Sequence, residues 1–386
     1  MKVIAFYLPQ FHEIPENNEW WGAGFTEWVN VRKATQYDDR QYQPRIPLNG
    51  NYYDLSDIEV MKWQAGVARK YGIYGFCIYH YWFHGKKLLE KPVENLLKCK
   101  EIELPFCLCW ANENWTNQWV RGTSQKTLIE QTYGDQEEWR GHFDYLLPFF
   151  QDERYIKENN QPFLVIYRPD LIPCLDEMLE QWDLWARESG FSGLCYAYQK
   201  ADNFSFNYKN GKDHNFKYQI EYQPGACSEW QRSKMKNTMI KWKRAVFRYL
   251  GSILHTQKFS TVILEGKLGV RNYDKDWLCI LNHKPISDKC IPGAFVDWDN
   301  TPRKKEWGWF YEGVSVDKFE KYFSRLILRA RDVYKKDMIF IFAWNEWAEG
   351  GYLEPDEKNQ YGYLHAIFNA LKKTRELPVW QERRDI

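Results

Sequence analysis

The sequence predicts a single-domain α/β protein, a (β/α)8 barrel of the TIM type with long loops after its strands. Eight short apolar runs alternate with helical patterns, as in parallel sheets that are covered on both faces. No glycine-rich dinucleotide fingerprint follows the first run, which disfavours an open, doubly wound sheet. The 386 residues suit one large barrel, and no internal repeat or linker divides the range 1–386.

The predicted strands are short and rich in apolar, β-branched and aromatic residues. Their ranges are 3–8, 75–79, 106–111, 163–167, 194–198, 218–222, 293–296 and 338–344. Strands of this kind, each followed by a helical segment, build a barrel whose interior is filled by side chains.

Two helices are predicted from clear signals. Ser56 and Glu59 have the spacing of a capping box, and Gly72 is expected to end the helix that they open. A second helix follows Ser315, and its apolar stripe holds the 3.6-residue spacing. The stripe comprises Phe319, Tyr322, Phe323, Leu326, Ile327, Ala330 and Val333. Weaker patterns predict helices at 139–150, at 176–189 and after Tyr361.

Two links depart from the regular barrel pattern. The segment 198–218 shows no helical stripe, so the fifth unit is expected to lack its helix. A long excursion at about 225–290, between strands 6 and 7, carries a basic helical segment. Its basic residues are Arg232, Lys234, Lys236, Lys241, Lys243, Arg244 and Arg248. We interpret this run as a solvated helix face, with contact to an anionic or lipid-linked substrate as the alternative.

Charge and hydropathy exclude several classes of protein. The 53 basic and 52 acidic side chains give a formal charge of +1, which disfavours a general nucleic-acid binder. No apolar stretch approaches the roughly 20 residues that span a bilayer. Pro9 interrupts the N-terminal apolar run before it can act as a secretory signal, and the nine cysteines are expected to be reduced. These features indicate a cytoplasmic protein, unless a leader has been removed, and they leave the oligomeric state open.

Aromatic residues are the strongest compositional signal. The chain has 20 Trp, 26 Tyr and 23 Phe, which together make 18% of its residues. Many of the rings lie beside Asn, Glu or Asp in loop-like segments, as at 19–21, 26–28, 114–119 and 345–347. Flat apolar faces mixed with amide and carboxylate groups suit sugar rings, which present C–H patches between hydroxyls. We therefore expect an oligosaccharide or polysaccharide ligand.

Polar side chains follow the predicted strands closely. In barrel enzymes the reacting groups project from the carboxyl ends of the strands. The residues at these positions are Gln10, His12, His80, Tyr81, Trp82, Asn112, Glu113, Asn114, Tyr167, Arg168, Asp170, Glu221, Asp297, Asp299, Asn345, Glu346 and Glu349.

The segment 343–351 is the sharpest feature. Glu346 and Glu349 stand three residues apart after the last strand, and tryptophans flank the first of them. Two carboxyls held close in an apolar setting push one pKa upward, so one serves as an acid and the other as a base. Cleavage of a glycosidic bond needs this division of roles. The alternative is that Glu346 bonds the backbone of its loop and Glu349 is solvated.

Motifs along nearly the whole chain resemble one known family. They lie at 6–12, 24–28, 75–83, 110–115, 166–169, 298–303 and 344–350. The sequence resembles the glycoside hydrolase family 99-like, or WbsX-type, domain of bacterial polysaccharide gene clusters. The resemblance implies a (β/α)8 barrel. In family-99 endo-α-mannosidases, the segment similar to 344–350 carries both catalytic glutamates.

Carried over, the resemblance implies that Glu346 is the base that assists attack by the sugar 2-hydroxyl. Glu349 would be the acid, and later the base, at the leaving oxygen. Net retention through a 1,2-anhydro sugar would follow. The match to the hydrolases is close only at this segment, and many WbsX-type proteins are labelled glycosyltransferases, so the direction of the reaction stays open.

The remaining candidates are expected to bind substrate. They are His12, Glu27, Trp28, His80, Tyr81, Trp82, Trp110, Asn112, Glu113, Asn114, Trp115, Tyr167, Arg168, Asp299, Arg303, Asn345 and Trp347. Glu113 with Glu346 forms a second possible pair, at the roughly 5 Å separation of conventional retaining enzymes.

No metal site or cofactor is predicted. Asp297 and Asp299 have the spacing with which nucleotide-sugar transferases hold a divalent cation, but a three-residue match is weak. Asp299 is more plausible as a substrate ligand or as a partner for Arg303. His80 and His84 stand four apart, with no third ligand at a suitable spacing.

The leading hypothesis is a metal-independent retaining glycoside hydrolase acting on a bacterial surface or capsular polysaccharide. A glycosyltransferase of O-antigen or capsular polysaccharide biosynthesis is the first alternative. A carbohydrate-binding protein without turnover is the second. The sugar, its linkage, and endo or exo action are not given by the sequence.

Overall fold

A parallel barrel forms the centre of the computed structural model, which describes residues 1–116, 127–201, 213–232, 242 and 268–379. The strands pair in the order β12-β10-β9-β8-β4-β2-β1-β15-β13, and each of these pairings is parallel. Because β12 and β13 are consecutive along the chain, the two ends of this path meet and the barrel is nearly closed. The α/β barrel predicted from the sequence is confirmed.

All eight predicted strands are present. Their bounds are β1 Lys2–Tyr7, β2 Gly75–Phe83, β4 Phe106–Trp110, β8 Gln161–Ile166, β9 Cys195–Lys200, β10 Tyr218–Glu221, β12 Cys290–Ile291, β13 Gly293–Phe295 and β15 Met338–Phe342. The seventh predicted strand, 293–296, corresponds to β13, and the structure adds the unpredicted β12 on the other side of Pro292. Proline has no N–H to donate to a ladder, so the chain leaves its pairing with β10 there and joins β15.

Gly293 lies at this seam. A Cβ built on Gly293 would overlap the carbonyl oxygen of Glu221, at the end of β10. Any larger residue would therefore push apart the two strands that complete the ring.

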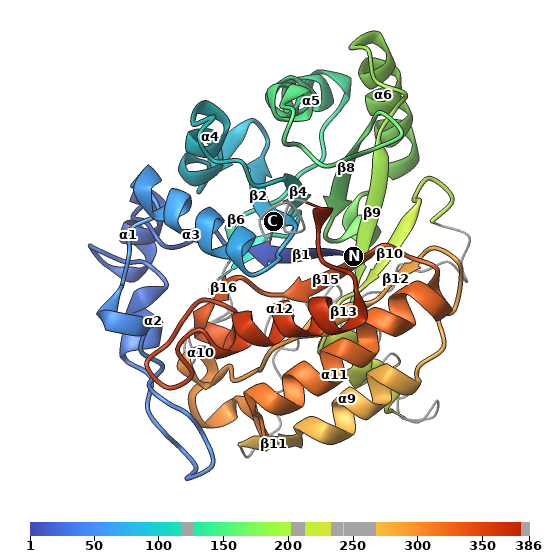
Figure 1. Ribbon diagram of the computed structural model, residues 1–386. Helices are drawn as coiled ribbons and strands as arrows, with labels where there is room; N and C mark the ends of the chain where they lie inside the picture. The colour runs from blue at the N-terminus through green and yellow to red at the C-terminus, as the bar shows by residue number, and fades with distance from the viewer. Residues whose placement is uncertain (117–126, 202–212, 233–241, 243–267, 380–386) are drawn as a thin grey trace.

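Helices surround the strands in Figure 1. Their bounds are α1 Pro15–Trp21, α2 Trp28–Arg32, α3 Ile58–Lys70, α4 Lys91–Lys98, α5 Gln136–Gln151, α6 Leu175–Glu188, α7 Gly225–Trp230, α9 Tyr273–Asn282, α10 Thr301–Lys304, α11 Val316–Arg329 and α12 Gly362–Thr374. The weaker predictions at 139–150, at 176–189 and after Tyr361 correspond to α5, α6 and α12. Part of the predicted excursion belongs to the barrel wall, since Trp277 of α9 is fully buried and stacks on Phe295 of β13.

The two clearly predicted helices are present, with two corrections. The N-cap of α3 is Asp57, whose side chain accepts the Glu59 N–H at 3.0 Å, so the cap assigned to Ser56 was wrong by one residue. Ser315 caps α11 as predicted. After α11 the chain makes a π-helical turn at Ala330–Tyr334, which shifts the apolar stripe so that Tyr334 is buried and Val333 is exposed.

Two sequence predictions fall largely outside the described residues. Between β9 and β10, no helix occurs in the described part of the link, and 202–212 lie outside it. Of the seven basic residues named above for the helical segment, only Arg232 is described.

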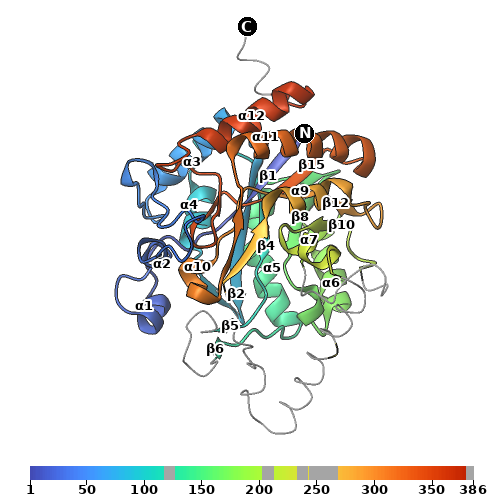
Figure 2. The same ribbon diagram turned by 90° about the horizontal axis from the view of Figure 1, so that it is seen from below.

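Short elements extend the barrel at the end toward which the strands run. Strand β3 (Lys86–Leu88) pairs with β2, while β5 (Trp115–Thr116) and β6 (Thr127–Ile129) form a hairpin. Figure 2 shows α1, α2, α10 and this hairpin gathered at that end. Strands β11 (Gly269–Asn272) and β14 (Trp309–Glu312) pair in parallel, and β7 (Lys157–Glu158) pairs with β8.

Two further properties concern membranes and cysteines. Among the described residues, no helix combines the length and the apolar character that a membrane span requires. All nine cysteines are free thiols, and six of them are buried.

We expect Gly293→Ala to destabilise the fold, because the added methyl overlaps backbone at the barrel seam. Overpacking of this kind costs about 1–3 kcal/mol or more. The matched control is Gly66→Ala, an exposed helical glycine of α3 where an added methyl would meet nothing within 4 Å. That change should stabilise by about 0.5–1 kcal/mol. Urea unfolding of both variants measures the difference in stability. An equal effect at the two sites would contradict the close packing of backbone at Gly293.

Candidate active site

The chain that follows β15 forms a tight turn that carries both predicted catalytic glutamates. Strand β16 (Asn345–Glu346) pairs with β17 (Gly351–Tyr352), and a 3-10 turn, Trp347–Glu349, connects them. A 3-10 helix has three residues per turn, so side chains at i and i+3 lie on the same side. Glu346 caps this turn and Glu349 ends it, which explains why a spacing of three brings the two carboxyls together.

Gly350 closes the turn in the left-handed conformation, at φ 68°. A Cβ there would lie 2.9 Å from the Arg45 guanidinium and from the Asp299 nitrogen. The backbone of the turn is therefore packed against the segment after β13, and Asp299 N–H donates to the Glu349 carbonyl at 2.8 Å.

Arg303 of α10 joins three carboxylates. Its Nη2 lies 3.0 Å from Glu346 Oε1 and 3.0 Å from Glu27 Oε2. Its Nη1 lies 3.2 Å from Glu349 Oε1. We call Glu27, Glu346, Glu349 and Arg303 the carboxylate cluster. Its members come from the loop before α2, from α10 and from the turn after β15, so the fold assembles the cluster from three separate parts of the chain.

The cluster is buried and carries more acid than base. Its four side chains are between 5% and 14% exposed. Burial raises the pKa of Glu346 well above its usual range and also raises that of Glu349, while Arg303 opposes both shifts. The neighbouring carboxylates Glu349 and Glu27 raise the pKa of Glu346 further. The charge of Lys304 also opposes the shift of Glu349, but three carboxylates still outnumber these two cations, which favours retention of a proton by the pair.

Within the described part of the chain, the two glutamates use only one carboxyl oxygen each. Glu346 and Glu349 both contact Arg303 through Oε1. Neither Oε2 accepts a hydrogen bond from any described residue. Each glutamate therefore has a second oxygen with no partner among these residues, which suits the transfer of a proton.

Asp299 has a structural role that differs from the predicted one. It is 1% exposed, and its oxygens accept from Thr301 N–H and Oγ1 and from Gln41 and Gln43. The Thr301 contacts hold the first turn of α10, which carries Arg303. The expectation that Asp299 binds substrate or pairs with Arg303 does not fit these contacts.

The Asp-x-Asp motif has no open carboxylate oxygen. Asp297 accepts from Arg45 at 2.7 Å and from Trp298 N–H at 2.7 Å, so all four oxygens of Asp297 and Asp299 are bonded to protein groups. In the described part of the chain, no group of three or more His, Cys, Asp and Glu is arranged to hold a metal ion.

Asn345 holds the turn against the first strand. Its Oδ1 accepts Leu8 N–H at 2.8 Å and its Nδ2 donates to Leu8 O at 3.0 Å. The side chain is fully buried. The structure thus uses the amide of Asn345 to support the backbone rather than to face a ligand.

Two tryptophans near the turn are also buried supports. Trp347 stacks on Tyr352 at 3.7 Å, and its indole N–H donates to Glu354 at 2.7 Å. Trp28 packs on Trp347 at 5.6 Å and donates to the Tyr53 carbonyl. Both were predicted to bind substrate, but the structure places them behind the turn.

Alternation along β2 separates the aromatic residues at its end. Successive side chains of a strand point to opposite faces. Tyr81 faces inward, where Gln10 donates to its hydroxyl at 2.9 Å, and its pKa is raised by burial and by the charge of Glu346. His80 and Trp82 face outward, against His142 of α5. The ring nitrogens of His80 and His142 lie 2.8 Å apart, and the stacked rings of Trp82 and His142 have centroids 4.6 Å apart.

The candidate site therefore does not include His80, Trp82 or Trp110. Trp110 packs on His142 and Trp182 beneath α5 and α6. Burial lowers the pKa of His80 to about 3, so this imidazole is neutral at physiological pH. The sequence analysis placed these residues correctly at the ends of their strands, but their side chains point to the outer face of the barrel and not to its interior.

Several other candidates remain near the carboxylate cluster. Half-buried Trp115 stacks on Tyr81 at 5.2 Å. Tyr167 follows β8, and the charges of Glu113 and Glu349 both raise its pKa after the larger effect of burial. Tyr167 therefore lies within electrostatic range of both carboxylates.

Glu113 and Arg168 form an ion pair, and Arg168 also contacts Asp170 at 2.9 Å. Burial raises the pKa of Glu113 although Arg168 opposes the shift. Asn112 is fully buried and bonds the Arg168 backbone through both its side-chain atoms, at 2.8 Å each. It therefore positions the Arg168 segment.

Two predicted residues lie apart from the cluster. Asn114 accepts Gln131 N–H at 2.7 Å in an exposed loop. His12 is 2% exposed, and burial lowers its pKa; the charges that act on it are those of Asp54, Lys91 and Glu90.

Sequence reasoning missed two important residues. Tyr222 follows β10, and its pKa is raised by burial and by the charges of Tyr167, Glu349 and Glu346, so it lies within electrostatic range of the cluster. Its position at the end of a predicted strand was the available signal. Glu354 accepts hydrogen bonds from four side chains and belongs to no recognisable sequence pattern.

Comparison with known proteins identifies the family. The family model described as "Glycosyltransferase WbsX" matches residues 3–367. The chain is 33% identical over 381 residues to "Uncharacterized protein WxcX" of Xanthomonas campestris pv. campestris, and 32% identical to the same protein of strain B100. Each match covers 97% of this chain and 50% of the relative, so the chain spans about half the length of the curated relatives that it matches.

Solved structures share the fold at low sequence identity. A GH99 endo-alpha-mannosidase from Bacteroides thetaiotaomicron has a TM-score of 0.51 and 13% identity, with 100% of this chain and 98% of that chain covered. A protein described as "Glycoside hydrolase-like protein" has a TM-score of 0.55 and 11% identity, with 98% and 94% covered. With the family match over most of its length, the chain belongs to the WbsX family.

Proposed function

We propose that this chain is a carbohydrate-active enzyme that cleaves glycosidic bonds with retention of configuration, using Glu346 and Glu349. The observation that carries the proposal is the arrangement of these two buried carboxyls. They share one guanidinium through Oε1, and each keeps its Oε2 without a partner among the described residues. Membership of the WbsX family and the GH99-like fold support a carbohydrate substrate.

In the first proposed step, Glu346 takes the proton of the sugar 2-hydroxyl and the 2-oxygen attacks C1. The bond from C1 to the leaving oxygen breaks, and Glu349 gives that oxygen its proton. The products are a 1,2-anhydro sugar and the released alcohol. Burial raises the pKa of both carboxyls, which favours one shared proton on the pair, and the resemblance to family 99 assigns that proton to Glu349.

In the second step, Glu349 takes a proton from water, and the water oxygen attacks C1. The bond between C1 and the 2-oxygen breaks, and Glu346 returns its proton to that oxygen. Two inversions at C1 give net retention. Each carboxyl ends the cycle in its starting protonation state, so no further proton donor is needed.

Arg303 is assigned a positioning and charge-balancing role. It orients both carboxyls through one planar group, and it keeps their pKa values from rising further. Tyr81, Tyr167 and Tyr222 border the same pair, and Trp115 adds a half-buried ring that can stack on a sugar.

A glycosyltransferase is the second candidate, because the family is described by that activity. A transferase of the Asp-x-Asp type would hold its nucleotide sugar through open carboxylate oxygens. The oxygens of Asp297 and Asp299 are all bonded to protein groups, which supports hydrolysis over that form of transfer.

We expect Glu349→Gln to lower turnover by about 10²–10⁴-fold, since the amide cannot give up a proton to the leaving oxygen. Sugar binding should persist. The measurement is a screen of aryl glycosides and bacterial polysaccharides, with and without EDTA. Glu177→Gln on exposed α6 is the matched control and should keep full activity.

Three outcomes would count against this function. Full activity of Glu349→Gln would remove the proposed acid. Turnover that requires a nucleotide sugar would establish transfer instead. Sugar binding without turnover of any substrate in the screen would indicate a carbohydrate-binding protein that is not an enzyme.

We expect Arg303→Met to be less stable than the wild type by about 3–5 kcal/mol at pH 8, because it leaves buried carboxylates without their cation. Without Arg303, the pKa values of Glu346 and Glu349 rise further above their unfolded values. The folded variant then binds more protons than the unfolded chain, so its stability falls as pH rises above about 4.5. The deficit should therefore shrink toward pH 5.

Urea unfolding at pH 5 and pH 8 measures this difference. Arg303→Lys keeps the positive charge and should show a smaller deficit with a weaker pH dependence. A deficit that grows as pH falls would contradict the charge-balancing role.

A further inference from the structure

A pocket is lined by Trp347, the first residue of the turn that ends at Glu349. Its volume is about 420 Å³, within the range of small-ligand sites. We call it the side pocket; its lining residues are Pro47, Leu48, Asn49, Gly50, Asn51, Tyr53, Trp63, Trp347, Glu354, Pro355 and Tyr361. Neither Glu346 nor Glu349 lines it, so it is separate from the proposed catalytic pair.

Backbone contacts join the two loops that form the pocket walls. Leu48 N–H donates to the Pro355 carbonyl at 3.0 Å, and Pro47 pairs with Asp356 as a β-bridge. Asn49 N–H donates to the Glu357 carboxylate at 2.6 Å. The walls are thus preformed, which lowers the ordering cost of binding a ligand.

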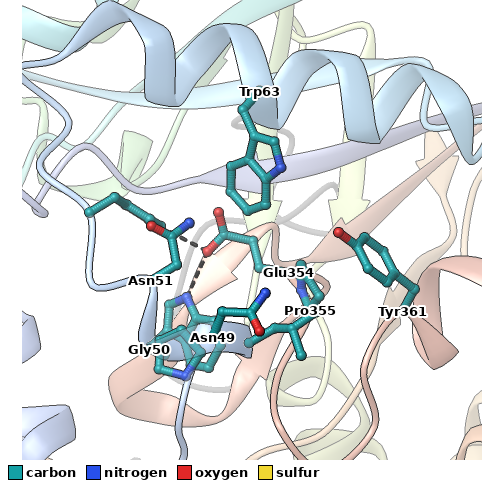
Figure 3. Close-up of a pocket in the computed structure, with 11 residues that line it drawn as sticks. Asn49, Gly50, Asn51, Trp63, Glu354, Pro355 and Tyr361 are labelled. Atoms are coloured by element: carbon teal, nitrogen blue, oxygen red, sulfur yellow. Dashed lines mark hydrogen bonds between the residues drawn. The ribbon is translucent and has the colours of Figure 1, made fainter.

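Aromatic rings and free amides face the same space. In Figure 3, Trp63 of α3 stands on one side, Tyr361 on another, and Asn49 and Asn51 approach from the loop. Both rings are partly exposed, and both asparagines are exposed. The side-chain amides of Asn49 and Asn51 bond no described residue, unlike that of Asn345 at the catalytic turn.

The base of the pocket is negative. Glu354 is 3% exposed and accepts from Gln64, Tyr53, Trp344 and Trp347 at 2.7–3.1 Å. All four donors are neutral, and no lysine or arginine lines the pocket. Burial raises the pKa of Glu354 to about 7, so the carboxylate is partly ionised at neutral pH. Because its acceptor positions are filled, Glu354 fixes the Tyr53 and Trp347 walls instead of bonding a ligand.

These features select the ligand class. A flat ring beside two amides matches a pyranose, with its C–H face on Trp63 and its hydroxyls at the amides. An uncompensated carboxylate at the base disfavours anionic sugars. We propose that the side pocket is a second carbohydrate site, which holds one neutral pyranose unit separately from the carboxylate cluster.

The proposal extends the proposed function, from which it takes only carbohydrate as the ligand class. Its test measures binding without turnover. Saturation-transfer NMR titrations use the methyl glycosides of neutral hexoses and 6-deoxyhexoses, methyl glucuronide as the anionic probe, and tetramethylammonium as the cationic probe. The protein is the full chain carrying Glu349→Gln, so no probe is consumed.

We expect at least one neutral glycoside to bind, and its affinity to fall at least tenfold with Trp63→Ala and with Asn51→Ala. The second variant removes only an exposed amide, so loss of binding there is not a folding defect. Asn282→Ala, at an exposed position on α9, should leave the affinity unchanged. Methyl glucuronide should bind at least several-fold more weakly.

Any of three results would overturn the side pocket as a neutral sugar site. The first is that no neutral glycoside binds, the second is that binding is indifferent to both pocket variants, and the third is that only tetramethylammonium binds there. A different outcome separates the two proposals. If the catalytic screen shows no turnover but a glycoside still binds in a way that depends on Trp63, the proposed function is rejected and the side pocket remains supported as a sugar site.

Discussion

The candidate site depends on one guanidinium in a buried setting. Arg303 contacts Glu27, Glu346 and Glu349, which the fold brings together from opposite ends of the sequence. Without a cation, three buried carboxyls at one place would be costly to ionise. With one cation they are still in excess, so the pKa values of Glu346 and Glu349 stay raised. The same interaction therefore holds the site together and sets its proton chemistry.

The surrounding structure serves to place this cluster. The barrel brings the turn after β15 beside β1, where Asn345 bonds the Leu8 backbone on both sides. Asp299 organises α10 and thereby Arg303. Behind the turn, Trp347 is fixed by Glu354, which also supports the side pocket. The turn that carries Glu346 and Glu349 thus shares one rigid wall with the side pocket, which is a physical basis for the two sugar positions that we propose.

Much of this arrangement is predictable from the sequence, because local patterns express it directly. Apolar runs located all eight strands, and the aligned ends of parallel strands gathered the polar residues at one end of the barrel. The three-residue spacing of the glutamates matches a 3-10 turn. At the end of β2, the wrong assignments of side chains arose from the alternation of side chains between the two faces of a strand. Alternation along β2 sends His80 outward and Tyr81 inward, and a register error of one residue reverses that assignment.

The barrel, the polar end of its strands and the paired glutamates are thus predictable from the sequence, since each depends on short-range periodicity or spacing. Which side chains meet depends on the tertiary structure. The folded chain places Arg303 rather than Asp299 at the carboxyls, packs Trp28 and Trp347 behind the turn, and forms the side pocket from α3, the loop before it and one distant loop. A contact such as that of Arg303 with Glu27, 276 positions away, leaves no local pattern, because it arises only when the strands close into a ring.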